Sequence, residues 1–393
     1  MPQDWLTQGE LDRAGIDLLA LQRGLTGERS LIGSSYMEEV RRLSAYLLFY
    51  WFTSYVQTWG MLDMAFTAYR AQGLKPISPK GQPGGASPRG DAPKKAVSCV
   101  RILDLGSGPG PCAFAAADWF RTREPAPETI EITACDQSLL ALEAAERLAK
   151  SAGYRFTKIG PWRAGTDTLP EGSYRCILIG HLLNELYQDD PDRIEKRAAL
   201  VNDLGKHLEP GGSIVILEPA LLGTGRDLLI LRDRLMEGPW QVAAPCFTQG
   251  PCPAAAQKNL TCHSDFTWDP PRTVRELERR TGLDKDVVKT TALVLYRPSD
   301  LQNSTKESQT TERPVSDKLY RLVSEPMLNK AGRTRLILCG KRGRIPLSVK
   351  LGAGYPAEHL FKKLRRSDAI VLHAPEQRET GLALGPATEI TRL

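Results

Sequence analysis

The sequence predicts an α/β protein whose core is a doubly wound, mainly parallel sheet, preceded by a helical block and followed by a small β-rich module. Two observations predict the core. An apolar run at 100–105 ends in a turn with three glycines and is followed by a helical pattern. Short apolar runs and helical patterns then alternate to about residue 219. Such repeats form a parallel sheet whose ligands bind at the carboxyl ends of its strands.

The chain before this core predicts a helical block over residues 1–72. Apolar and aromatic residues recur there at three- and four-residue spacing between Tyr36 and Arg70. These aromatic side chains could form a base-stacking platform, but we expect them to pack between helices, because bulky rings commonly fill such cores. Residues 73–98 are rich in Gly, Pro, Ser and Lys and predict a flexible linker.

The turn at 104–110 has the sequence DLGSGPG. Glycine is needed there because the backbone adopts angles that a Cβ forbids and because a ligand approaches the turn closely. The third glycine comes one residue earlier than in the G-x-G-x-x-G pattern of dinucleotide-binding proteins. The turn resembles the first motif of S-adenosylmethionine-dependent methyltransferases. This resemblance implies a Rossmann-like methyltransferase domain over 99–299 with cofactor contacts from Asp104, Gly106, Gly108 and Gly110.

The other core elements are predicted as strands 101–105, 129–134, 175–179 and 213–217 and helices 111–121, 138–152 and 193–207. Asp136 follows the second strand, where this fold places an acid that accepts hydrogen bonds from ribose hydroxyls. Asp167 lies in a loop that we expect on the adenine side of the cofactor. The catalytic candidates follow the strand at 175–179 and would face the methyl group, although each could equally cap a helix: His181, Asn184 and Glu185.

Two catalytic signatures are missing from the places where they would be expected. An amino-methyltransferase carries [DN]-P-P-[YFW] just after its fourth strand, whereas Asp269-Pro270-Pro271 comes about ninety residues later and is followed by arginine. A pyrimidine methyltransferase with a cysteine nucleophile needs Pro-Cys near the carboxyl edge of the sheet, where this chain has Gly180-His181. The chemistry therefore stays unassigned.

Three cysteines, Cys246, Cys252 and Cys262, lie in a loop over residues 240–268 that is rich in Pro, Gly and Gln. A long loop without regular structure needs a functional cause, and a metal centre supplies one. Its fourth ligand is either the adjacent His263 or Cys339, which ends a predicted strand beside a hairpin turn. We favour Cys339, because a thiol at a strand end can point outward. Spacing alone leaves zinc and an iron–sulfur cluster open.

Beyond a second predicted linker at 300–315, residues 316–373 predict a basic β-rich module, similar to a small barrel or an oligonucleotide-binding fold. Residues 374–393 predict a disordered tail. From residue 301 onward, 17 lysines and arginines face nine aspartates and glutamates, although the net charge of the whole chain is only +6. A basic region of this kind suits a polyanion such as RNA. The RNA-binding candidates crowd one predicted hairpin: Arg333, Arg335, Lys341, Arg342 and Arg344.

The first residues contain acids and no apolar core, so we expect neither a secretory signal nor a mitochondrial transit peptide. The most apolar run, at 45–52, is too short to cross a bilayer, so we expect no membrane partner. Eight cysteines in such a chain indicate thiols or metal ligands rather than disulfides. We expect a monomeric protein of the bacterial cytoplasm.

Together these features resemble a known family, the mitochondrial small-ribosomal-subunit methyltransferase-like assembly factors and their bacterial relatives. The motifs that carry the resemblance are AYL at 45–47, LDLGSGPG at 103–110, HLLNEL at 181–186, the P-C-x5-C-P…C-H array at 245–263, SEP at 324–326 and LILC at 336–339. The resemblance implies S-adenosylmethionine, action on the small ribosomal subunit or its rRNA, and a 4Fe-4S cluster on Cys246, Cys252, Cys262 and Cys339. Where relatives read C-P-H and W-C-H-F, this chain has CFT at 246–248 and TCHS at 261–264, so the surroundings of its cluster differ.

Three functions stay open at this point. The first is an enzyme that methylates rRNA, and the glycine turn together with Asp136 motivates it. The second is a non-catalytic assembly factor that binds rRNA with the same fold, and the missing catalytic signatures motivate that hypothesis. The third, a small-molecule methyltransferase, leaves the basic C-terminal region unexplained.

Overall fold

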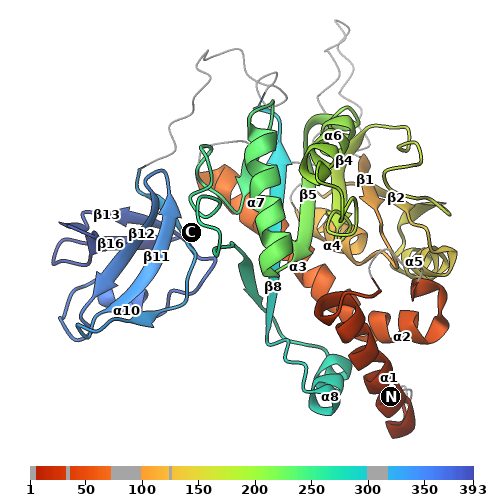
Figure 1. The fold of residues 1–393 in the computed structure, drawn as a ribbon, viewed down its shortest axis with the longest axis horizontal. Helices are drawn as coiled ribbons and strands as arrows, with labels where there is room; N and C mark the ends of the chain where they lie inside the picture. The colour runs from red at the N-terminus through yellow and green to blue at the C-terminus, as the bar shows by residue number, and fades with distance from the viewer. Residues whose placement is uncertain (1–5, 32–35, 72–98, 124–125, 299–316) are drawn as a thin grey trace, which may run out of the picture. The chain divides into compact units, whose positions relative to one another are not determined.

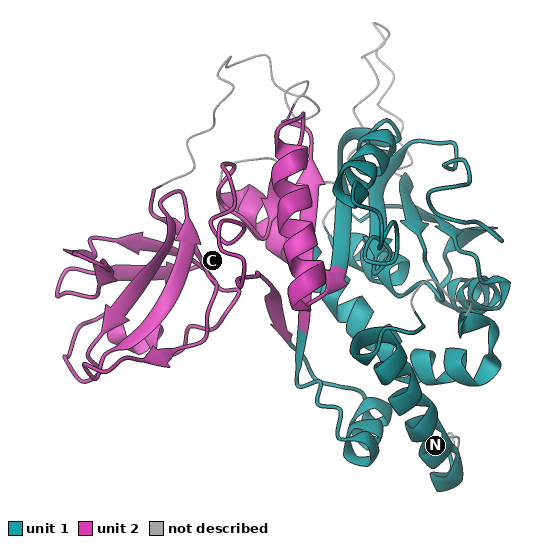
Figure 2. Ribbon diagram, viewed as in Figure 1, with its two compact units in different colours: residues 1–62, 77–217, 267–288 teal, residues 63–76, 218–266, 289–393 magenta. Residues whose placement is uncertain are grey.

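The chain divides into two units, which Figure 2 shows in teal and magenta. The first contains residues 1–62, 77–217 and 267–288, and the second contains residues 63–76, 218–266 and 289–393. The computed structural model describes residues 6–31, 36–71, 99–123, 126–298 and 317–393. The linkers expected at 73–98 and 300–315 lie outside the described residues. The expected domain at 99–299 is shared between the two units, since residues 218–266 and those from 289 onward group with the C-terminal module.

The sheet of the first unit has five parallel strands: β1 (Cys99–Leu105), β2 (Thr129–Cys135), β3 (Arg155–Ile159), β4 (Tyr174–Gly180) and β5 (Leu208–Pro219). Their order in the sheet is β3-β2-β1-β4-β5. The chain therefore leaves β1 toward one edge and later returns to the other side of β1. This is the doubly wound arrangement, and its switch point lies between β1 and β4. The predicted fold class is confirmed.

Three helices follow these strands: α4 (Pro111–Arg121), α5 (Leu139–Ala152) and α6 (Arg193–Gly205). Pro111 is the first helical residue of α4, where its missing N–H costs nothing. Ser138 caps α5 by accepting a hydrogen bond from the Ala141 amide at 3.1 Å. β3 was not predicted, because it is an edge strand whose side chains are mostly exposed and partly charged.

The N-terminal block contains α1 (Gln8–Gln22), a π-helical turn (Arg23–Gly27), a 3-10 turn (Tyr36–Glu38), α2 (Val40–Leu48) and α3 (Tyr50–Ala71). Its core also includes α8 (Arg272–Thr281), which follows much later in the chain. Phe49 is fully buried in this core, and Tyr46 and Tyr50 pack against it. The aromatic residues of this region therefore pack between helices, as expected.

The second unit contains the last part of α3. After residue 217 it continues with α7 (Leu222–Met236), β6 (Gln241–Ala244), β7 (Ser264–Thr267) and β8 (Val287–Tyr296). β6 and β8 pair in antiparallel fashion, and β7 pairs with β8. The loop that carries the three cysteines connects β6 to β7. α7 was not predicted, because two glycines in its first turn, Gly223 and Gly225, weaken the helical pattern.

The C-terminal module contains β9 (Leu319–Leu322), β10 (Met327–Leu328), β11 (Thr334–Gly340), β12 (Gly343–Val349) and the short α10 (Glu358–Phe361). It continues with β13 (Ala369–His373), β14 (Glu376–Arg378), β15 (Gly381–Ala383) and β16 (Glu389–Arg392). The sheet order is β14-β15-β12-β11-β9-β13-β16, with β10 on β11 (blue in Figure 1). Its buried core includes Leu336, Leu338, Leu347, Phe361 and Ile370.

The disordered tail expected at 374–393 is a wrong prediction, because these residues form β14, β15 and β16. β16 pairs with β13, and Leu382, Ala383 and Leu384 are buried. The strands have only three or four residues each, too few to show the alternation that marks a strand in a sequence. Within the described ranges, no helix combines the length and the hydropathy that a bilayer span requires.

Candidate functional site

The glycine turn joins β1 to α4 at the switch point of the first sheet. Gly106, Gly108 and Gly110 have φ angles of 64°, 52° and 79°, in the left-handed region that favours glycine. A Cβ at Gly106 would lie 2.9 Å from Leu182, and one at Gly110 would lie 2.8 Å from Phe114. The turn therefore requires glycine for its backbone angles and for its close neighbours.

Asp136 connects the end of β2 to this turn. Its Oδ2 accepts a hydrogen bond from the Gly108 amide at 2.7 Å, and its Oδ1 accepts one from the Ser138 amide at 2.8 Å. Burial raises the pKa of Asp136, and the two amide hydrogen bonds act against this rise. A carboxylate at this place can accept hydrogen bonds from ribose hydroxyls.

Asp104 is the second-last residue of β1 and is buried just before the turn. Its side chain is almost completely buried, and Oδ2 accepts a hydrogen bond from the Ala113 amide in the first turn of α4 at 3.1 Å. Within the described residues, its Oδ1 is buried without a hydrogen-bond partner. Burial raises the pKa of Asp104 to about 8. Asp104 therefore ties the helix to the strand and keeps the turn in shape.

Side chains of the N-terminal block lie directly against the glycine turn. A Cβ at Gly108 would lie 3.1 Å from the Met37 Sδ, and Trp51 Nε1 donates a hydrogen bond to the Pro109 carbonyl at 3.1 Å. Sequence reasoning did not assign Met37 or Leu182 to this site. Each is a single apolar residue without a local pattern, so no sequence signal marks its position.

The three catalytic candidates follow β4. The His181 ring lies 3.0 Å from Gln57 Oε1, and burial lowers the pKa of His181 to about 4, so this imidazole is neutral at neutral pH. Asn184 is buried, and it donates a hydrogen bond to the His181 carbonyl at 2.8 Å and accepts one from Arg29 at 2.9 Å. Glu185 acts electrostatically on the half-buried Tyr36: desolvation raises the pKa of Tyr36, and the charge of Glu185 raises it further. These contacts give His181 and Asn184 clear structural roles.

Asp167 lies in the exposed loop after β3. Its carboxylate accepts a hydrogen bond from the Arg163 amide at 2.8 Å, which closes a local turn. The neighbouring Trp162 is buried, and its amide donates to the Asp136 carbonyl at 2.9 Å. The loop is therefore anchored beside Asp136 by Trp162, while Asp167 shapes the loop itself.

The second unit holds the cysteine site. Cys246, Cys252, Cys262 and Cys339 line one small cavity that is partly open to solvent. Three of them come from the loop between β6 and β7, and Cys339 comes from β11. His263, the other candidate for the fourth ligand, lines the same cavity. The other four cysteines lie on β1, α4, β2 and β4 of the first unit.

Backbone contacts hold the loop cysteines in place. The Cys252 amide donates to both carboxylate oxygens of Asp233 at 3.0 Å, and the Cys262 carbonyl accepts from Thr291 Oγ1 at 2.9 Å. Burial and the charge of neighbouring thiols raise the pKa of Cys262 and Cys339 to about 12. Deprotonation of these thiols is therefore unfavourable. A metal cation bound among them would offset the cost of forming the thiolates.

Cationic side chains surround this cavity. Arg232 and Arg344 line it, and Arg321 on β9 is buried beside it with its guanidinium over the Phe247 ring, 4.8 Å from the ring centroid. Sequence reasoning did not assign Arg232 or Arg321 to the site. An arginine in a helix or a strand normally predicts a surface residue, so the sequence carries no signal for their burial.

The basic residues expected to bind RNA lie on and beside the β11–β12 hairpin. Arg335, Lys341 and Arg342 are exposed, and Lys341 pairs with Asp317 at 3.1 Å. Arg333 lies near Ser348, with its Nε 3.4 Å from the hydroxyl oxygen. Arg344 lines the cysteine cavity instead of facing only solvent. The structure thus brings four of the five cations to the surface of one hairpin.

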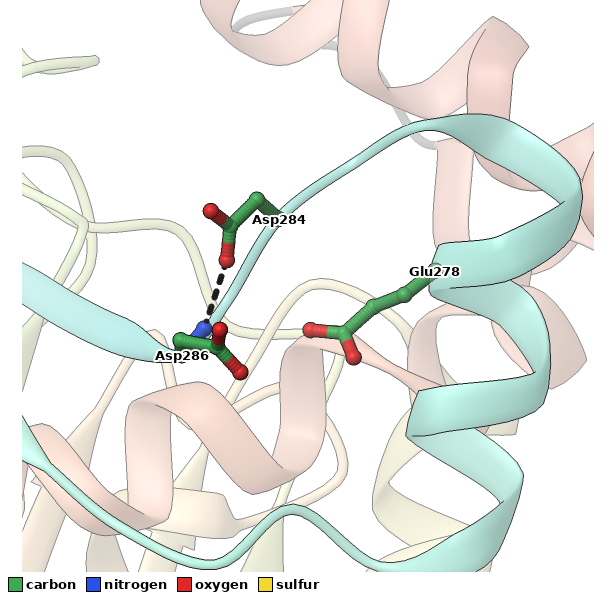
Figure 3. A group of neighbouring side chains, drawn as sticks. All are labelled: Glu278, Asp284 and Asp286. Carbon is green, nitrogen blue, oxygen red and sulfur yellow. Dashed lines mark hydrogen bonds between the residues drawn. The ribbon is translucent and has the colours of Figure 1, made fainter.

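A third group of potential ligands lies at the end of α8 and in the segment after it: Glu278 is on the helix, and Asp284 and Asp286 follow it (Figure 3). Glu278 accepts a hydrogen bond from the Lys285 amide at 2.8 Å, and Asp284 accepts one from the Asp286 amide at 2.8 Å. These carboxylates therefore stabilise the turn that they occupy. Among the described residues, this is the one group of three or more ligand atoms that all lie within 4.8 Å of one another, so the cavity cysteines are spaced more widely.

Comparison with protein families identifies a relationship over most of the chain. Residues 95–350 match the family described as mitochondrial small ribosomal subunit Rsm22. The chain belongs to the Rsm22 family. The region that matches Rsm22 contains the glycine turn, Asp136 and all four cavity cysteines, which confirms the family resemblance inferred from the sequence. No curated protein matches the sequence.

Solved structures with a similar fold include several methyltransferases. A methyltransferase from Pyrococcus furiosus is 14% identical, with a TM-score of 0.29, and covers 49% of this chain and 73% of its own. A putative class I S-adenosylmethionine-dependent methyltransferase from Listeria monocytogenes is 11% identical, with a TM-score of 0.33, and covers 57% and 61%. An S-adenosylmethionine-dependent methyltransferase from Geobacter sulfurreducens in complex with S-adenosylhomocysteine is 16% identical, with a TM-score of 0.29, and covers 50% and 84%.

Proposed function

We propose that this protein is an S-adenosylmethionine-dependent methyltransferase that acts on the small ribosomal subunit or its rRNA in a bacterial cytoplasm. The observation that carries the proposal is the hydrogen bond between Asp136 and the Gly108 amide at the switch point of the sheet. It holds a ribose-binding acid beside a turn in which any Cβ would be strained. Membership of the Rsm22 family supports the ribosomal partner.

The residues of this site fit the cofactor. Asp136 would hold the ribose hydroxyls, the amides of the turn would face the charged part of the cofactor, and Asp104 would keep the turn in place. Bound S-adenosylmethionine supplies an electrophilic methyl group. The protein would contribute binding and orientation, because the neutral His181 and the buried Asn184 already have structural partners.

We further propose that the cavity cysteines hold a 4Fe-4S cluster. The support is the donor set, since four thiols from two distant segments surround one cavity with arginines at its wall. Zinc is the alternative metal. A tetrahedral zinc site with Zn–S bonds of about 2.3 Å needs sulfur atoms roughly 3.8 Å apart. No three of these sulfur atoms all lie within 4.8 Å of one another, so either metal would have to draw the thiols together.

The basic hairpin supports RNA as the partner. Arg335, Lys341 and Arg342 are exposed on one module whose surroundings carry an excess of positive charge. Lysine and arginine neutralise backbone phosphates, and this gives affinity without sequence preference. The cofactor site would then supply chemistry, and the hairpin would supply attachment to the ribosomal particle.

Methyl transfer from labelled S-adenosylmethionine to immature small subunits tests the proposal. The protein is loaded with iron and sulfide anaerobically, and Asp136→Ala serves as the control. Label that appears in rRNA or in a ribosomal protein with the wild type, but not with the variant, supports it. Binding of S-adenosylmethionine without any transfer would contradict the enzymatic part.

A non-catalytic assembly factor is the second candidate function. The observation that favours it is the position of Met37 and Trp51, which lie against the glycine turn, together with the structural hydrogen bonds of His181 and Asn184. In that case the variant Asp136→Ala would still support small-subunit assembly in cells. Loss of assembly with Asp136→Ala, at unchanged protein level and ribosome binding, would exclude this candidate.

A further inference from the structure

Arg321 is a buried arginine without an acidic partner. Its side chain sits on β9, and the residue is only 5% exposed. Its Nε donates to the Pro245 carbonyl, and its Nη1 donates to the Ser367 carbonyl at 2.7 Å. Within the described part of the chain it forms no ion pair with a carboxylate. These hydrogen bonds engage two of its five donors, and carbonyl groups do not neutralise its charge.

A guanidinium stays protonated in proteins, so burying it without an anion is unfavourable. Arg321 lies directly opposite Cys339 in the antiparallel ladder of β9 and β11, and Cys339 lines the cavity with Cys246 and Cys262. Burial lowers the pKa of Arg321 to about 10, and the charges of these three cysteines and of Asp368 act in the opposite direction. Asp368 pairs with Arg392, so the thiolates that a bound metal would create are the anions left for Arg321.

Two of the neighbouring cations have acidic partners. Arg232 is fully buried, but it pairs with Asp233, which also accepts the Cys252 amide. Arg366 lies 3.6 Å from the Asp265 carboxylate. Arg344 lines the cavity as well, so Arg321 and Arg344 share the compensation of negative charge at the cysteine site.

We infer that Arg321 is a positioning residue whose charge compensates the negative charge of a four-thiolate metal centre in this cavity. Four thiolates around a dicationic centre leave the site with excess negative charge, whether the centre is a cluster or a single metal ion. Arg321 also joins Pro245, which precedes Cys246, to Ser367 of the C-terminal module. This inference rests on the metal centre proposed above.

The test compares three variants after anaerobic reconstitution with iron and sulfide. Arg321→Gln removes the charge, Arg321→Lys keeps it, and Arg378→Gln removes an exposed arginine from the same module as a matched control. Two quantities are measured: the lifetime of the cluster absorbance in the presence of an iron chelator, and the midpoint potential of the cluster. The lifetime reports how firmly the protein retains the cluster, and the midpoint potential reports the charge around the cluster. Neither measurement depends on methyl transfer.

In Arg321→Gln we expect cluster loss to be about 10- to 100-fold faster than in the wild type. Its midpoint potential should be more negative, because a reduced centre loses the cation that stabilises it. Arg321→Lys and Arg378→Gln should stay close to the wild type. An Arg321→Lys variant as unstable as Arg321→Gln would overturn the inference, because the hydrogen bonds would then matter rather than the charge.

A second pair of variants covers the case in which Arg321→Gln does not fold. Thr248 lines the cavity and is half-buried, so Thr248→Asp and Thr248→Asn place nearly isosteric side chains there that differ in charge. Faster cluster loss in Thr248→Asp than in Thr248→Asn supports the inference, and equal lifetimes contradict it. A wild type that takes up neither iron nor sulfide refutes the proposed cluster itself. A loaded wild type with an equally stable Arg321→Gln variant refutes this inference alone.

Discussion

Cys339 on β11 lies directly opposite Arg344 on β12 in the antiparallel ladder. Opposed residues point to the same face of a sheet, and both line the cysteine cavity. The opposite face carries the core, with Leu338 and Leu336 paired to Ile345 and Leu347. One face of this hairpin therefore builds the module, and the other contributes a thiol and a cation to the candidate metal site.

Cys339→Ser should lower the metal content of the reconstituted protein and its melting temperature. A serine hydroxyl is a much poorer ligand for iron than a thiolate, so a four-thiolate centre loses one of its bonds. Iron and sulfide analysis and thermal unfolding of the loaded protein measure the effect. Cys99→Ser is the control, since Cys99 lies on β1 of the other unit. Equal metal content in both variants would contradict the assignment of Cys339.

Asp136→Asn should weaken binding of S-adenosylmethionine by about 10- to 100-fold, as expected for the loss of charge-assisted hydrogen bonds. Asp167→Asn should have a much smaller effect, because the Asp167 carboxylate is exposed and caps its own loop. Calorimetric titration of both variants gives the comparison. A larger loss in Asp167→Asn would show that the adenine-side loop dominates recognition.

Gly108→Ala should destabilise the protein by about 1–2 kcal/mol from its positive φ alone, with a further cost from the Met37 sulfur 3.1 Å from the new Cβ. Gly153→Ala is the matched control, because Gly153 also has a positive φ but has no atom within 4 Å of an added Cβ. Denaturant unfolding measures both. Met37→Ala in the Gly108→Ala background should recover the difference between them.

The stability of the protein should fall as the pH rises from about 4 to about 8 because of Asp104. Burial raises the pKa of Asp104 to about 8, so the folded protein holds a proton that the unfolded chain releases near its ordinary pKa of about 3.9. Its contribution is therefore complete below pH 4 and is lost as the pH rises to 8. The free energy of unfolding of Asp104→Asn should depend less on pH over this range, and an unchanged slope would contradict the shift.

Arg335→Ala combined with Lys341→Ala should weaken binding to rRNA and make it less dependent on salt, because each lost phosphate contact lowers the slope of log affinity against log salt by about 0.7–0.9. Cluster lifetime should not change in this variant. Arg344→Ala should instead shorten the cluster lifetime and leave rRNA binding unchanged, since Arg344 lines the cavity. Filter binding at several salt concentrations distinguishes the two roles.

Local sequence patterns predicted the elements that depend mainly on their own residues, namely the glycine turn and the buried strands. The glycine turn could be predicted because its backbone angles exclude other residues, and β1, β2 and β4 because they are buried, continuous apolar runs. β3 escaped prediction because an edge strand has little to bury. The strands after residue 374 escaped it because each is too short to show a period.

Contacts between distant segments determine the parts of the candidate sites that could not be predicted from the sequence. The position of Cys339 at a strand end indicated that it could reach the loop cysteines. Nothing local marks Met37 as a neighbour of Gly108, or Arg321 as a buried cation, because both follow from packing between elements far apart in the chain. Arginine side chains are usually exposed, so the residue type predicts the wrong burial for Arg321.

The order of the four cysteines along the chain has a consequence for biosynthesis. The first three leave the ribosome together, whereas the thiol on β11 emerges only after β9 and the chain between them have been made. A complete set of donors therefore exists only after β11 has been made. If the proposed inorganic centre binds there, its insertion must wait until β11 has emerged, and a prematurely terminated chain that lacks β11 could not retain it.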